Sequence, residues 1–371
     1  MEQHTSYMRR AIELAKKGTG AVNPNPLVGA VIVKDGIILN EDYHHRYGEF
    51  HAERNAILNC KHDMHGATIY VTLEPCCHYG KTPPCTEAII EAGISTVYIG
   101  SRDPNPLVAG KGAQILRDAG ITVIEDFLRD ECDALNPVFF HFISTNTPYV
   151  VLKYAMTLDG KLATYTGASQ WITNEKARKH VHYLRHKYTG IMTGIGTVLA
   201  DNPTMNCRME GGRNPIRIVC DSKLRIPLDC NICKTAKEYK TIVACCCDEP
   251  EKEASLKELG IKVLKVPFKD GHLDLQALML LLGKEKIDSI LLEGGQALNY
   301  SALASGIVQH VCCYIGAKIF GGQAGFTPVG GQGVAVPDEA FHMINTTIET
   351  FDGDFLLEGD IERNQSLCLQ E

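Results

Sequence analysis

Residues 73–87 read LEPCCHYGKTPPCTE and place Cys76, Cys77, His78 and Cys85 within one short stretch. Sulfur and imidazole nitrogen are the ligands that Zn²⁺ prefers in proteins. A catalytic zinc site uses three protein ligands and keeps one position for water, whereas a structural site uses four. The stretch therefore indicates a candidate zinc site, and it leaves open which of its side chains, if any, bind the ion.

A second short motif lies upstream, where residues 51–53 read HAE. The combination H-x-E followed by P-C…C is typical of zinc deaminases, in which one histidine and two thiolates bind the metal and the glutamate transfers protons. Pro75 and Cys76 supply the P-C pair. We therefore predict that His51 and Cys76 are zinc ligands and that Glu53 is the catalytic acid and base.

The second cysteine of the motif departs from the usual C-x-x-C spacing, because position 79 is a tyrosine. Adjacent thiols rarely bind one tetrahedral ion without strain, so Cys77 is a poor ligand. Cys85 follows a Pro-Pro pair and begins an expected helix, whose first turn favours a thiolate. We predict Cys85 as the third ligand. A four-ligand structural site that uses His78 or Cys77 is the alternative, and it leaves Glu53 without a role.

Length and composition limit the class of protein. A chain of 371 residues exceeds one ordinary hydrophobic core, which predicts two domains. The net charge of −7, with no basic stretch and no long apolar run, argues against a nucleic-acid or membrane partner. Fifteen cysteines without an apolar signal region predict reduced thiols in a cytoplasmic protein. We expect the cysteines at 245–247, 312 and 313 to be buried as small hydrophobic residues.

Apolar periodicity divides the chain into two α/β halves. Residues 27–42 predict a β-hairpin around an Asp-Gly pair, and helices then alternate with strands to about residue 128. This alternation predicts a sheet covered by helices on both faces. It restarts at Tyr149, after the polar segment 145–148, and ends in strands that we expect to be antiparallel. We place the two domains at 1–146 and 147–371.

Longer blocks resemble one family, the bifunctional riboflavin-biosynthesis deaminase/reductases. In the first half the blocks are NPNPLVGAVIVKDG, HAE, TLEPCCHYGKTPPCT and DPNPLVAGKG. In the second half they are LKYAMTLDGK, SQWITNE, RHKY, GIGTVLADNP and LLEGG. They occur in family order between about residues 5 and 300. Asp42 and Phe50 stand where the family commonly has glycine and proline, which concerns the local loop shape and not the metal.

The resemblance implies an α/β fold with an N-terminal zinc cytidine-deaminase-like three-layer domain and a C-terminal dihydrofolate-reductase-like domain. It implies that the first domain uses Zn²⁺ to deaminate 2,5-diamino-6-(5-phosphoribosylamino)pyrimidin-4-one. The second domain would then use NADPH to reduce the ribosyl group, giving 5-amino-6-(5-phosphoribitylamino)uracil. We also expect a homo-oligomer that acts on this small molecule and binds neither nucleic acid nor membrane.

The residues of the second half give only a partial indication of a dinucleotide site. TGIGTVLADNP places Gly194 and Gly196 between a strand and a helix, but Leu199 stands where G-x-G-x-x-G requires its third glycine. A Rossmann domain is therefore disfavoured. LLEGGQALNYSAL predicts a strand, a glycine turn and a helix start, whose N–H groups can hold a phosphate or simply form a tight turn.

The resemblance also assigns contacts by position. It implies NADPH contacts at Ala155, Trp171, Thr197, Asp201, Ser222 and the stretch from Gly295. It implies substrate contacts at Asn25, Lys153, Ser169, Arg185, Met205, Arg208 and Glu293, with Lys153 orienting the ribose. The guanidinium forks of Arg185 and Arg208 suit a phosphate, and an ion pair is the alternative for each.

Other roles remain open for several residues. Asn25 is equally consistent with a turn between two prolines, and His44, His45 and His78 with phosphate contacts or structural roles. A nucleic-acid deaminase is a rival function, but it would need a basic single-strand channel, which the net charge opposes. A zinc-containing scaffold that only senses nucleotide is another, and the intact HAE and cysteine motifs oppose it.

Overall fold

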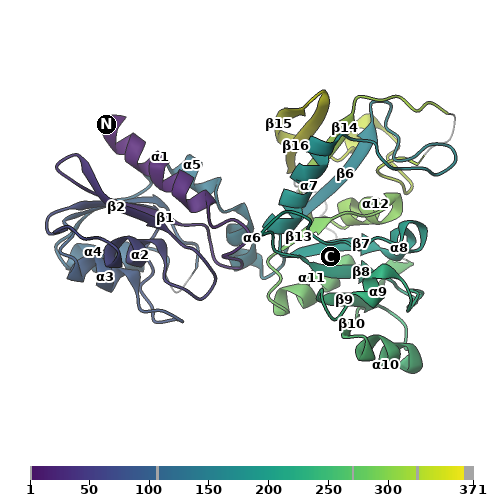
Figure 1. The fold of residues 1–371 in the computed structure, drawn as a ribbon, viewed down its shortest axis with the longest axis horizontal. Helices are drawn as coiled ribbons and strands as arrows, with labels where there is room; N and C mark the ends of the chain where they lie inside the picture. The colour runs from purple at the N-terminus through teal and green to yellow at the C-terminus, as the bar shows by residue number, and fades with distance from the viewer. Residues whose placement is uncertain (1, 106–107, 270, 323–325, 363–371) are drawn as a thin grey trace. The chain divides into compact units, whose positions relative to one another are not determined.

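The protein is described from a computed structural model that covers residues 2–105, 108–269, 271–322 and 326–362. The chain divides into two compact units, Met1–Asn146 and Thr147–Glu371, whose helices and strands are labelled in Figure 1. The cysteines among the described residues are free thiols.

The first unit is built on a five-stranded sheet with the order β2-β1-β3-β4-β5. β1 pairs antiparallel with β2 and β3, whereas β3, β4 and β5 run parallel. The predicted hairpin is thus confirmed as β1 and β2. The strands are β1 (Gly29–Lys34), β2 (Ile37–Tyr43), β3 (Thr68–Leu73), β4 (Thr96–Ser101) and β5 (Thr122–Ile124).

Helices cover both faces of this sheet because successive strand residues point to opposite sides. Val31 and Val33 pack in one cluster with α1 (Glu2–Lys16) and with Cys132 of α5 (Arg129–Asp133). Ala30 and Ile32 pack in the opposite cluster, and Figure 1 shows the two helix layers. The second layer consists of α2 (Ala52–Leu58), α3 (Cys85–Glu91) and α4 (Lys111–Asp118), and α6 (Pro137–Thr145) closes the unit. The predicted three-layer α/β arrangement is confirmed.

The second unit is built on a nine-stranded sheet with the order β10-β9-β8-β7-β13-β6-β14-β16-β15. The strands from β10 to β14 in this order pair in parallel, whereas β16 pairs antiparallel with both β14 and β15. The predicted antiparallel ending is therefore confirmed. The strands are β6 (Tyr149–Thr157), β7 (Gly190–Gly194), β8 (Ile216–Cys220), β9 (Thr241–Cys245), β10 (Ile261–Lys265), β13 (Ser289–Leu292), β14 (Val308–Gly316), β15 (Met343–Phe351) and β16 (Asp354–Ile361), with a separate β11 (Phe268–Lys269) and β12 (His272–Leu273) ribbon.

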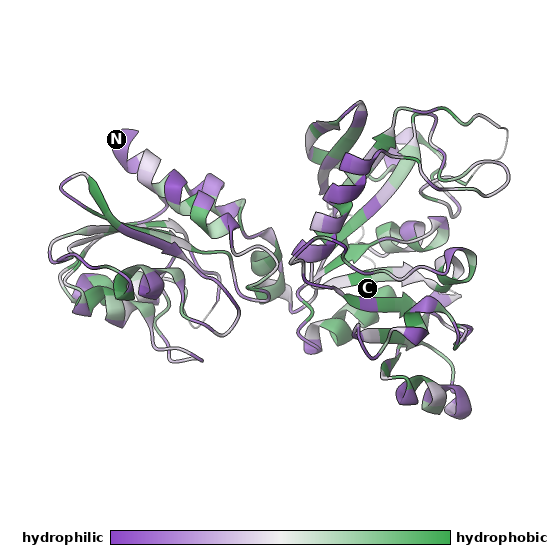
Figure 2. Ribbon diagram, in the orientation of Figure 1, coloured by the Kyte–Doolittle hydropathy of each residue, from purple (hydrophilic) through white to green (hydrophobic). Residues whose placement is uncertain are grey.

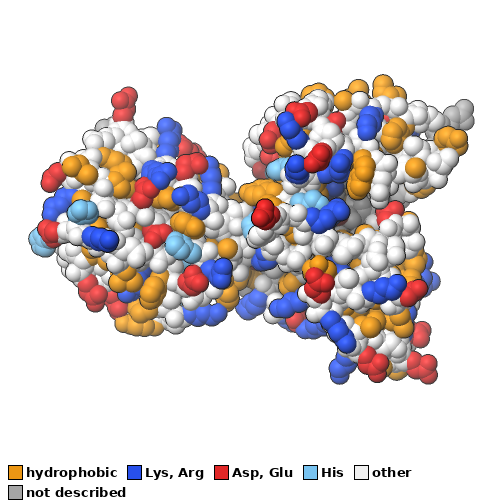
Figure 3. Space-filling view, viewed as in Figure 1, with side chains coloured by type: hydrophobic (Ala, Val, Ile, Leu, Met, Phe, Trp, Pro, Cys, Tyr) orange, Lys and Arg blue, Asp and Glu red, His pale blue; other side chains and the backbone are white. Residues whose placement is uncertain are grey.

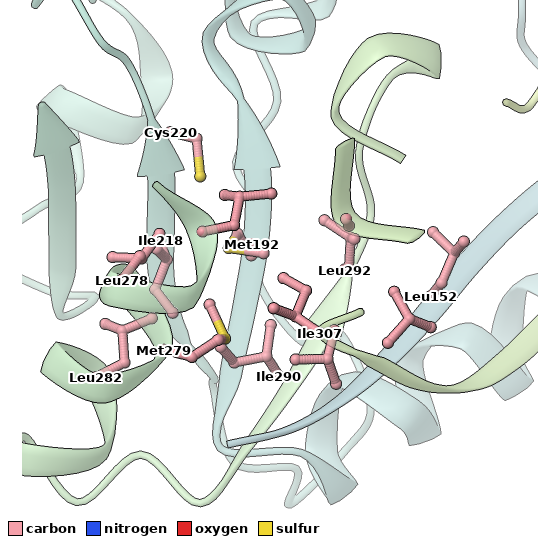
Figure 4. Packing of buried hydrophobic residues seen from close by; sticks show 14 of the residues in the cluster. Leu152, Met192, Ile218, Cys220, Leu278, Met279, Leu282, Ile290, Leu292 and Ile307 are labelled. Carbon is pink, nitrogen blue, oxygen red and sulfur yellow. The ribbon is translucent and has the colours of Figure 1, made fainter. Parts of the chain in front are cut away.

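The main core of the second unit lies between this sheet and two helices. Figure 4 shows Met192, Ile218 and Ile290, from three neighbouring strands, facing Leu278 and Leu282 of α11. A second cluster covers the other face with residues of α8, α9 and α10, and Figure 2 shows α10 as a mainly hydrophilic helix. The helices are α7 (Glu175–Lys187), α8 (Ile195–Asp201), α9 (Asn231–Lys234), α10 (Pro250–Glu258), α11 (Leu275–Lys284) and α12 (Gln296–Ala304), and a 3₁₀ turn spans Pro337–Glu339.

Two observations concern membrane crossing and surface charge. Within the described residues, no helix combines the length and the apolar character that crossing a membrane requires. Figure 3 shows acidic and basic side chains interspersed on the face in view, on both units.

The expected burial of cysteines holds for Cys245, Cys312 and Cys313. It is wrong for Cys246 and Cys247, which are only half-buried because β9 has ended at the residue before them.

Gly29 begins β1 at the point where α1 crosses the strand. A Cβ at this position would lie 2.0 Å from Ala11 O and 2.9 Å from Ala15 N, both in the backbone of α1. Because these atoms cannot rotate away, Gly29→Ala should displace the helix and lower the free energy of unfolding of the first unit by about 1–3 kcal/mol. Chemical denaturation measures this change. Gly80→Ala, whose Cβ meets nothing within 4 Å, is the control, and equal destabilisation by both substitutions would contradict the account.

Candidate zinc centre and reductase pocket

Three elements of the first unit bring the predicted zinc ligands together. His51 precedes α2, Cys76 follows β3, and Cys85 is the first residue of α3. The Sγ atoms of Cys76 and Cys85 lie 3.4 and 3.6 Å from His51 Nδ1. The N–H of Cys85 donates to Cys76 O at 3.0 Å, which holds the two ends of the intervening loop together. The three ligand atoms lie within 4.8 Å of one another, a spacing that one tetrahedral ion can bridge.

Electrostatics favour a metal-binding thiolate in this cluster. A hydrogen bond from Cys85, together with the neighbouring His51, lowers the pKa of the Cys76 thiol to about 4 against the effect of burial. Burial lowers the pKa of His51, but the neighbouring Cys76 outweighs burial and leaves that pKa raised. A soft cation is the partner that satisfies two sulfurs and one imidazole at once.

Glu53 lies beside the cluster on the first turn of α2 and is buried, with 2% of its surface exposed. Its Oε2 atom makes no hydrogen bond within the described residues. Burial raises the pKa of its carboxyl group to about 7, and a cation at the neighbouring ligands would lower that pKa. A buried carboxyl with one unpaired oxygen and a pKa near neutrality suits a group that accepts and returns a proton.

A cavity of about 260 Å³ opens in front of these residues. Asn25 and His44 line it, and the pKa of His44 is lowered by burial, which favours the neutral ring. Nδ1 of His44 lies 2.9 Å from Phe50 O and therefore carries the proton, so Nε2 accepts from the Asn25 amide at 3.1 Å. Asn25 therefore lines the cavity in the structure and is not only a residue of the turn between two prolines. His78 also lines the cavity, whereas His45 pairs with Asp42.

The sequence patterns did not single out three polar residues of this cavity, Glu74, Asp103 and Asn105. Glu74 accepts hydrogen bonds from Gly110 N at 3.0 Å and Ala113 N at 3.2 Å, so it fixes the start of α4. Burial raises the pKa of Asp103 to about 6. The sequence did contain a signal for Asp103 and Asn105, which lie in the DPNP segment after β4. The cysteine loop follows β3, and polar residues that follow two parallel strands lie at the same edge of the sheet.

A second cavity, of about 720 Å³, lies in the second unit at the carboxyl ends of parallel strands. This is the edge at which open α/β sheets bind ligands. Among the predicted residues, the cavity is lined by Ser169, Thr197, Asp201, Ser222 and Gly295. Ala155, in β6, and Trp171 are not among its lining residues. Trp171 is half-exposed, and the Arg178 guanidinium lies 4.6 Å from its ring centroid.

The remaining predicted residues of the second unit gather around Glu293. Arg185 donates from Nε and Nη2 to the two Glu293 oxygens at 2.7 and 3.0 Å, and Lys153 Nζ lies 3.5 Å from Oε2. In the structure Arg185 therefore forms an ion pair, which was the alternative to a phosphate contact. Burial raises the pKa of Glu293, but Arg185 and Lys153 outweigh burial and hold that pKa at about 2.

Two further predicted residues lie next to this ion pair. Arg208 donates from Nε to His182 Nε2 at 3.1 Å, and it is exposed. Burial, together with the charges of Arg185 and Arg208, lowers the pKa of His182 to about 4, so the ring accepts as a neutral group. Met205 is buried and has a positive φ of 54°. Met205 and Arg208 flank Asn206, whose carbonyl accepts from Arg185 at 2.9 Å.

Comparison with known proteins assigns both units. Residues 148–357 match the family model of the RibD C-terminal domain, and residues 1–101 match that of the cytidine and deoxycytidylate deaminase zinc-binding region. The riboflavin biosynthesis protein RibD of Actinobacillus pleuropneumoniae is 56% identical over 352 residues, covering 95% of this chain and 94% of that protein. This chain belongs to the RibD family. It is a bifunctional deaminase and reductase of riboflavin biosynthesis, as the resemblance implied.

Solved structures of RibD proteins agree over the whole chain. The Thermotoga maritima protein described as a diaminohydroxyphosphoribosylaminopyrimidine deaminase/5-amino-6-(5-phosphoribosylamino)uracil reductase has a TM-score of 0.85 and 40% identity, with 97% of this chain and 99% of that one covered. Acinetobacter baumannii RibD has a TM-score of 0.88 and 35% identity, with 98% and 99% covered. Residues 1–101, which match the cytidine and deoxycytidylate deaminase zinc-binding region, contain all three predicted ligands.

Glu293→Gln removes the charge that compensates two buried cations. We expect it to lower the free energy of unfolding of the reductase unit by about 3–5 kcal/mol, because Arg185 would stay buried without its partner. Differential scanning calorimetry of the full chain measures the loss. In the unchanged protein the contribution of Glu293 is complete at neutral pH and is lost as the pH falls from 4.5 toward about 2, because folding lowers this pKa.

Glu285→Gln is the matched control for this substitution. Glu285 pairs with Lys262 at 2.6 Å on the surface, where 37% and 49% of the two side chains are exposed. Exposed pairs contribute only about 0–1 kcal/mol. Equal losses for the two variants would contradict the burial argument for Glu293.

Proposed function

We propose that the first unit hydrolytically deaminates 2,5-diamino-6-(5-phosphoribosylamino)pyrimidin-4-one. The second unit then reduces the ribosyl group of the product with NADPH, to give 5-amino-6-(5-phosphoribitylamino)uracil. The observation that carries the proposal is the convergence of one imidazole and two thiols beside a buried, unpaired carboxylate oxygen at the wall of a cavity. The name of the Thermotoga maritima relative supports the choice of substrate.

For the deaminase step we propose that His51, Cys76 and Cys85 bind Zn²⁺. Zinc, when bound by three protein ligands, lowers the pKa of a coordinated water to about 7. Glu53 is the catalytic acid and base in this proposal. Its carboxylate accepts one proton from the attacking water and passes it to a ring nitrogen. It then accepts the second proton from the hydroxyl group of the adduct and passes it to the amino group, which leaves as ammonia.

The polar cavity wall supports recognition of the pyrimidine ring. Asn25, Asp103 and Asn105 offer amide and carboxylate groups around the cavity that Glu53 faces. The neutral His44 ring holds the Asn25 amide in one orientation through the 3.1 Å contact. Groups fixed in this way orient a substrate without losing further side-chain entropy, which favours a defined position of the amino group relative to Glu53.

Glu53→Gln removes the proton carrier while keeping the size of the side chain. We expect the rate of ammonia release to fall on the order of 10²-fold or more. The zinc content should stay unchanged, because Glu53 is not a ligand in this proposal. Reduction of separately supplied deaminated intermediate should also continue, since the second unit contains its own pocket.

Glu49→Gln is the matched control, because Glu49 is an exposed carboxylate that lines the same cavity. We expect nearly normal ammonia release from this variant. Full deaminase activity of the Glu53→Gln protein would refute the assigned role of Glu53.

For the reductase step we propose that the larger cavity binds NADPH through Thr197, Asp201, Ser222 and the turn at Gly295. The backbone N–H groups at the start of α12, directly after Gly295, suit a phosphate. NADPH, when bound, supplies the hydride that reduces the ribosyl group. By family position Ala155 and Trp171 also belong to the cofactor site, and these two stay proposals from the resemblance alone.

For the substrate of the second unit we propose contacts with Lys153, Ser169, Arg185, Met205, Arg208 and Glu293. The Glu293 carboxylate, fixed by Arg185, positions the Lys153 ammonium 3.5 Å away. A fixed ammonium can orient the ribose hydroxyls by donating to them. Of the two arginines, Arg208 is the exposed one, so its guanidinium is accessible to the substrate phosphate.

The preference for NADPH over NADH is supported by Arg225. Arg225 carries the only permanent positive charge among the described residues that line the larger cavity. It follows β8 in the same loop as Ser222, and in the described part of the chain its guanidinium forms one long ion pair, with Asp221 Oδ1 4.0 Å from Nε. An arginine near the adenosine ribose accommodates the 2′-phosphate that distinguishes NADPH from NADH.

Arg225→Ala should raise the KM for NADPH by about 10- to 100-fold, because a charge-assisted hydrogen bond contributes about 1.5–3 kcal/mol. The KM for NADH and the kcat with either cofactor should change little. Steady-state absorbance assays with the deaminated intermediate measure both. Lys223→Ala, in the same loop but outside the cavity lining, is the control. An unchanged KM ratio in the Arg225→Ala protein would contradict this role.

Two further expectations stay predictions. We propose that the chain acts as a homo-oligomer and in the cytoplasm. Sedimentation velocity of the full chain tests the first, and a single species of 40.8 kDa would contradict it.

A further inference from the structure

Four side chains that neither proposed site uses form a block on one face of the reductase sheet. They are His310 and Cys312 on β14 and Glu358 and Asp360 on β16. The strands pair antiparallel, with His310 opposite Asp360 and Cys312 opposite Glu358. Residues two apart on a strand share a face, so all four side chains project to the same side.

Three of the four side chains present ligand atoms to one point. Glu358 Oε2 lies 3.7 Å from Cys312 Sγ and 3.8 Å from His310 Nε2, and the three atoms lie within 4.8 Å of one another. The deaminase ligands have similar separations, 3.4 and 3.6 Å. Bonds of about 2.0–2.3 Å from one zinc ion to nitrogen, oxygen and sulfur produce ligand separations in this range.

The fourth side chain orients the histidine. Asp360 Oδ1 accepts from His310 Nδ1 at 2.8 Å, and the other Asp360 oxygen accepts from Asn345 Nδ2 at 3.1 Å. Metal-binding histidines usually donate their second ring N–H to a carboxylate in this way, which fixes the ring and directs the free nitrogen at the ion. Thr347 Oγ1 likewise donates to the second Glu358 oxygen at 3.4 Å, so Oε2 stays directed at Cys312.

Accessibility is compatible with an exchangeable ion. Cys312 is buried, whereas 21% of the His310 side chain and 38% of the Glu358 side chain are exposed. Water can therefore reach one side of the three ligand atoms and complete a fourth position. The competing state is a protonated His310 between two carboxylates, and Lys187 adds a further positive charge near Glu358.

We propose that His310, Cys312 and Glu358 bind a second ion, Zn²⁺ or a similar thiophilic divalent cation, in the reductase unit. The ion would cross-link β14 and β16. Because β14 also pairs with β6, where Lys153 lies opposite Cys312, the cross-link would fix the strands next to the proposed ribose-orienting lysine. This site is independent of the deaminase ligands, which lie in the other unit.

Zinc stoichiometry tests the proposal. The full chain is stripped with a chelator, dialysed to equilibrium against micromolar free zinc, and analysed by mass spectrometry of the metal. We expect two zinc ions per chain for the unchanged protein, one for Cys312→Ser, one for Cys85→Ser and none for the double variant. Glu358→Gln, which keeps the size of the side chain, should also bind one.

Cys313→Ser is the matched control, because Cys313 is the next residue of β14 and is buried on the opposite face of the sheet. It should still bind two ions. Cobalt substitution gives a second readout, since the Cys85→Ser chain should keep a sulfur-to-cobalt absorption band that disappears when Cys312→Ser is added. Circular dichroism establishes that each variant is folded. One zinc ion per unchanged chain, or two in a folded Cys312→Ser chain, would overturn the proposal.

Discussion

The deaminase unit depends on holding two cysteine sulfurs against one imidazole with a carboxylate beside them. Burying this much ionisable surface is unfavourable unless the charges are compensated, and one divalent cation compensates both sulfurs together. The three elements that supply the ligands all start or end at the same edge of the sheet. The backbone hydrogen bonds from Cys85 and Thr86 to Cys76 O keep the long loop from separating the two sulfurs. The position of Glu53 on the first turn of α2 then follows from that of His51, two residues earlier.

The reductase unit compensates its buried charges with protein side chains alone. Glu293 leaves β13 into the interior, where Arg185 from α7 and Lys153 from β6 meet its carboxylate. Each of the three comes from a different element, so the ion pairs fix the relative positions of a helix and two strands. The cofactor cavity and this ion-paired cluster both adjoin the carboxyl end of β13, through Gly295 and Glu293. In the proposed function this arrangement would bring the hydride donor and the ribosyl substrate to one edge of the sheet.

The sequence grouped the candidate zinc ligands that the structure brings together, because their motifs are local. The spacing of HAE and the P-C pair singled out His51, Glu53 and Cys76, and the proline pair before Cys85 indicated the helix start that α3 has. Glu74 and Asp103 escaped prediction because their roles arise only when the loop after β4 folds against the cysteine loop. Glu74 accepts hydrogen bonds from the start of α4, which is distant in sequence. A contact of this kind leaves no periodic pattern in the residues around Glu74.

The reductase half was less predictable for the same physical reason. Lys153, Arg185 and Glu293 lie in three separate blocks, and only the family resemblance grouped them. In the structure β6, which carries Lys153, pairs with β13, which Glu293 follows, and Arg185 meets them from α7. Arg225 had no glycine motif to indicate it. The cysteine prediction failed where β9 ends, at Cys246, since strand propensity does not specify the last paired residue. It also gave Cys312 no role beyond packing, because its neighbours Glu358 and Asp360 lie on a strand far along the chain.

Anomalous diffraction at the zinc absorption edge tests the central claim most directly. The account predicts a zinc peak in the first unit bonded to His51 Nδ1 and to the sulfurs of Cys76 and Cys85, with one solvent oxygen at the fourth position facing Glu53. A peak whose fourth ligand is Cys77 or His78, or an active protein with no metal at these residues, would contradict it.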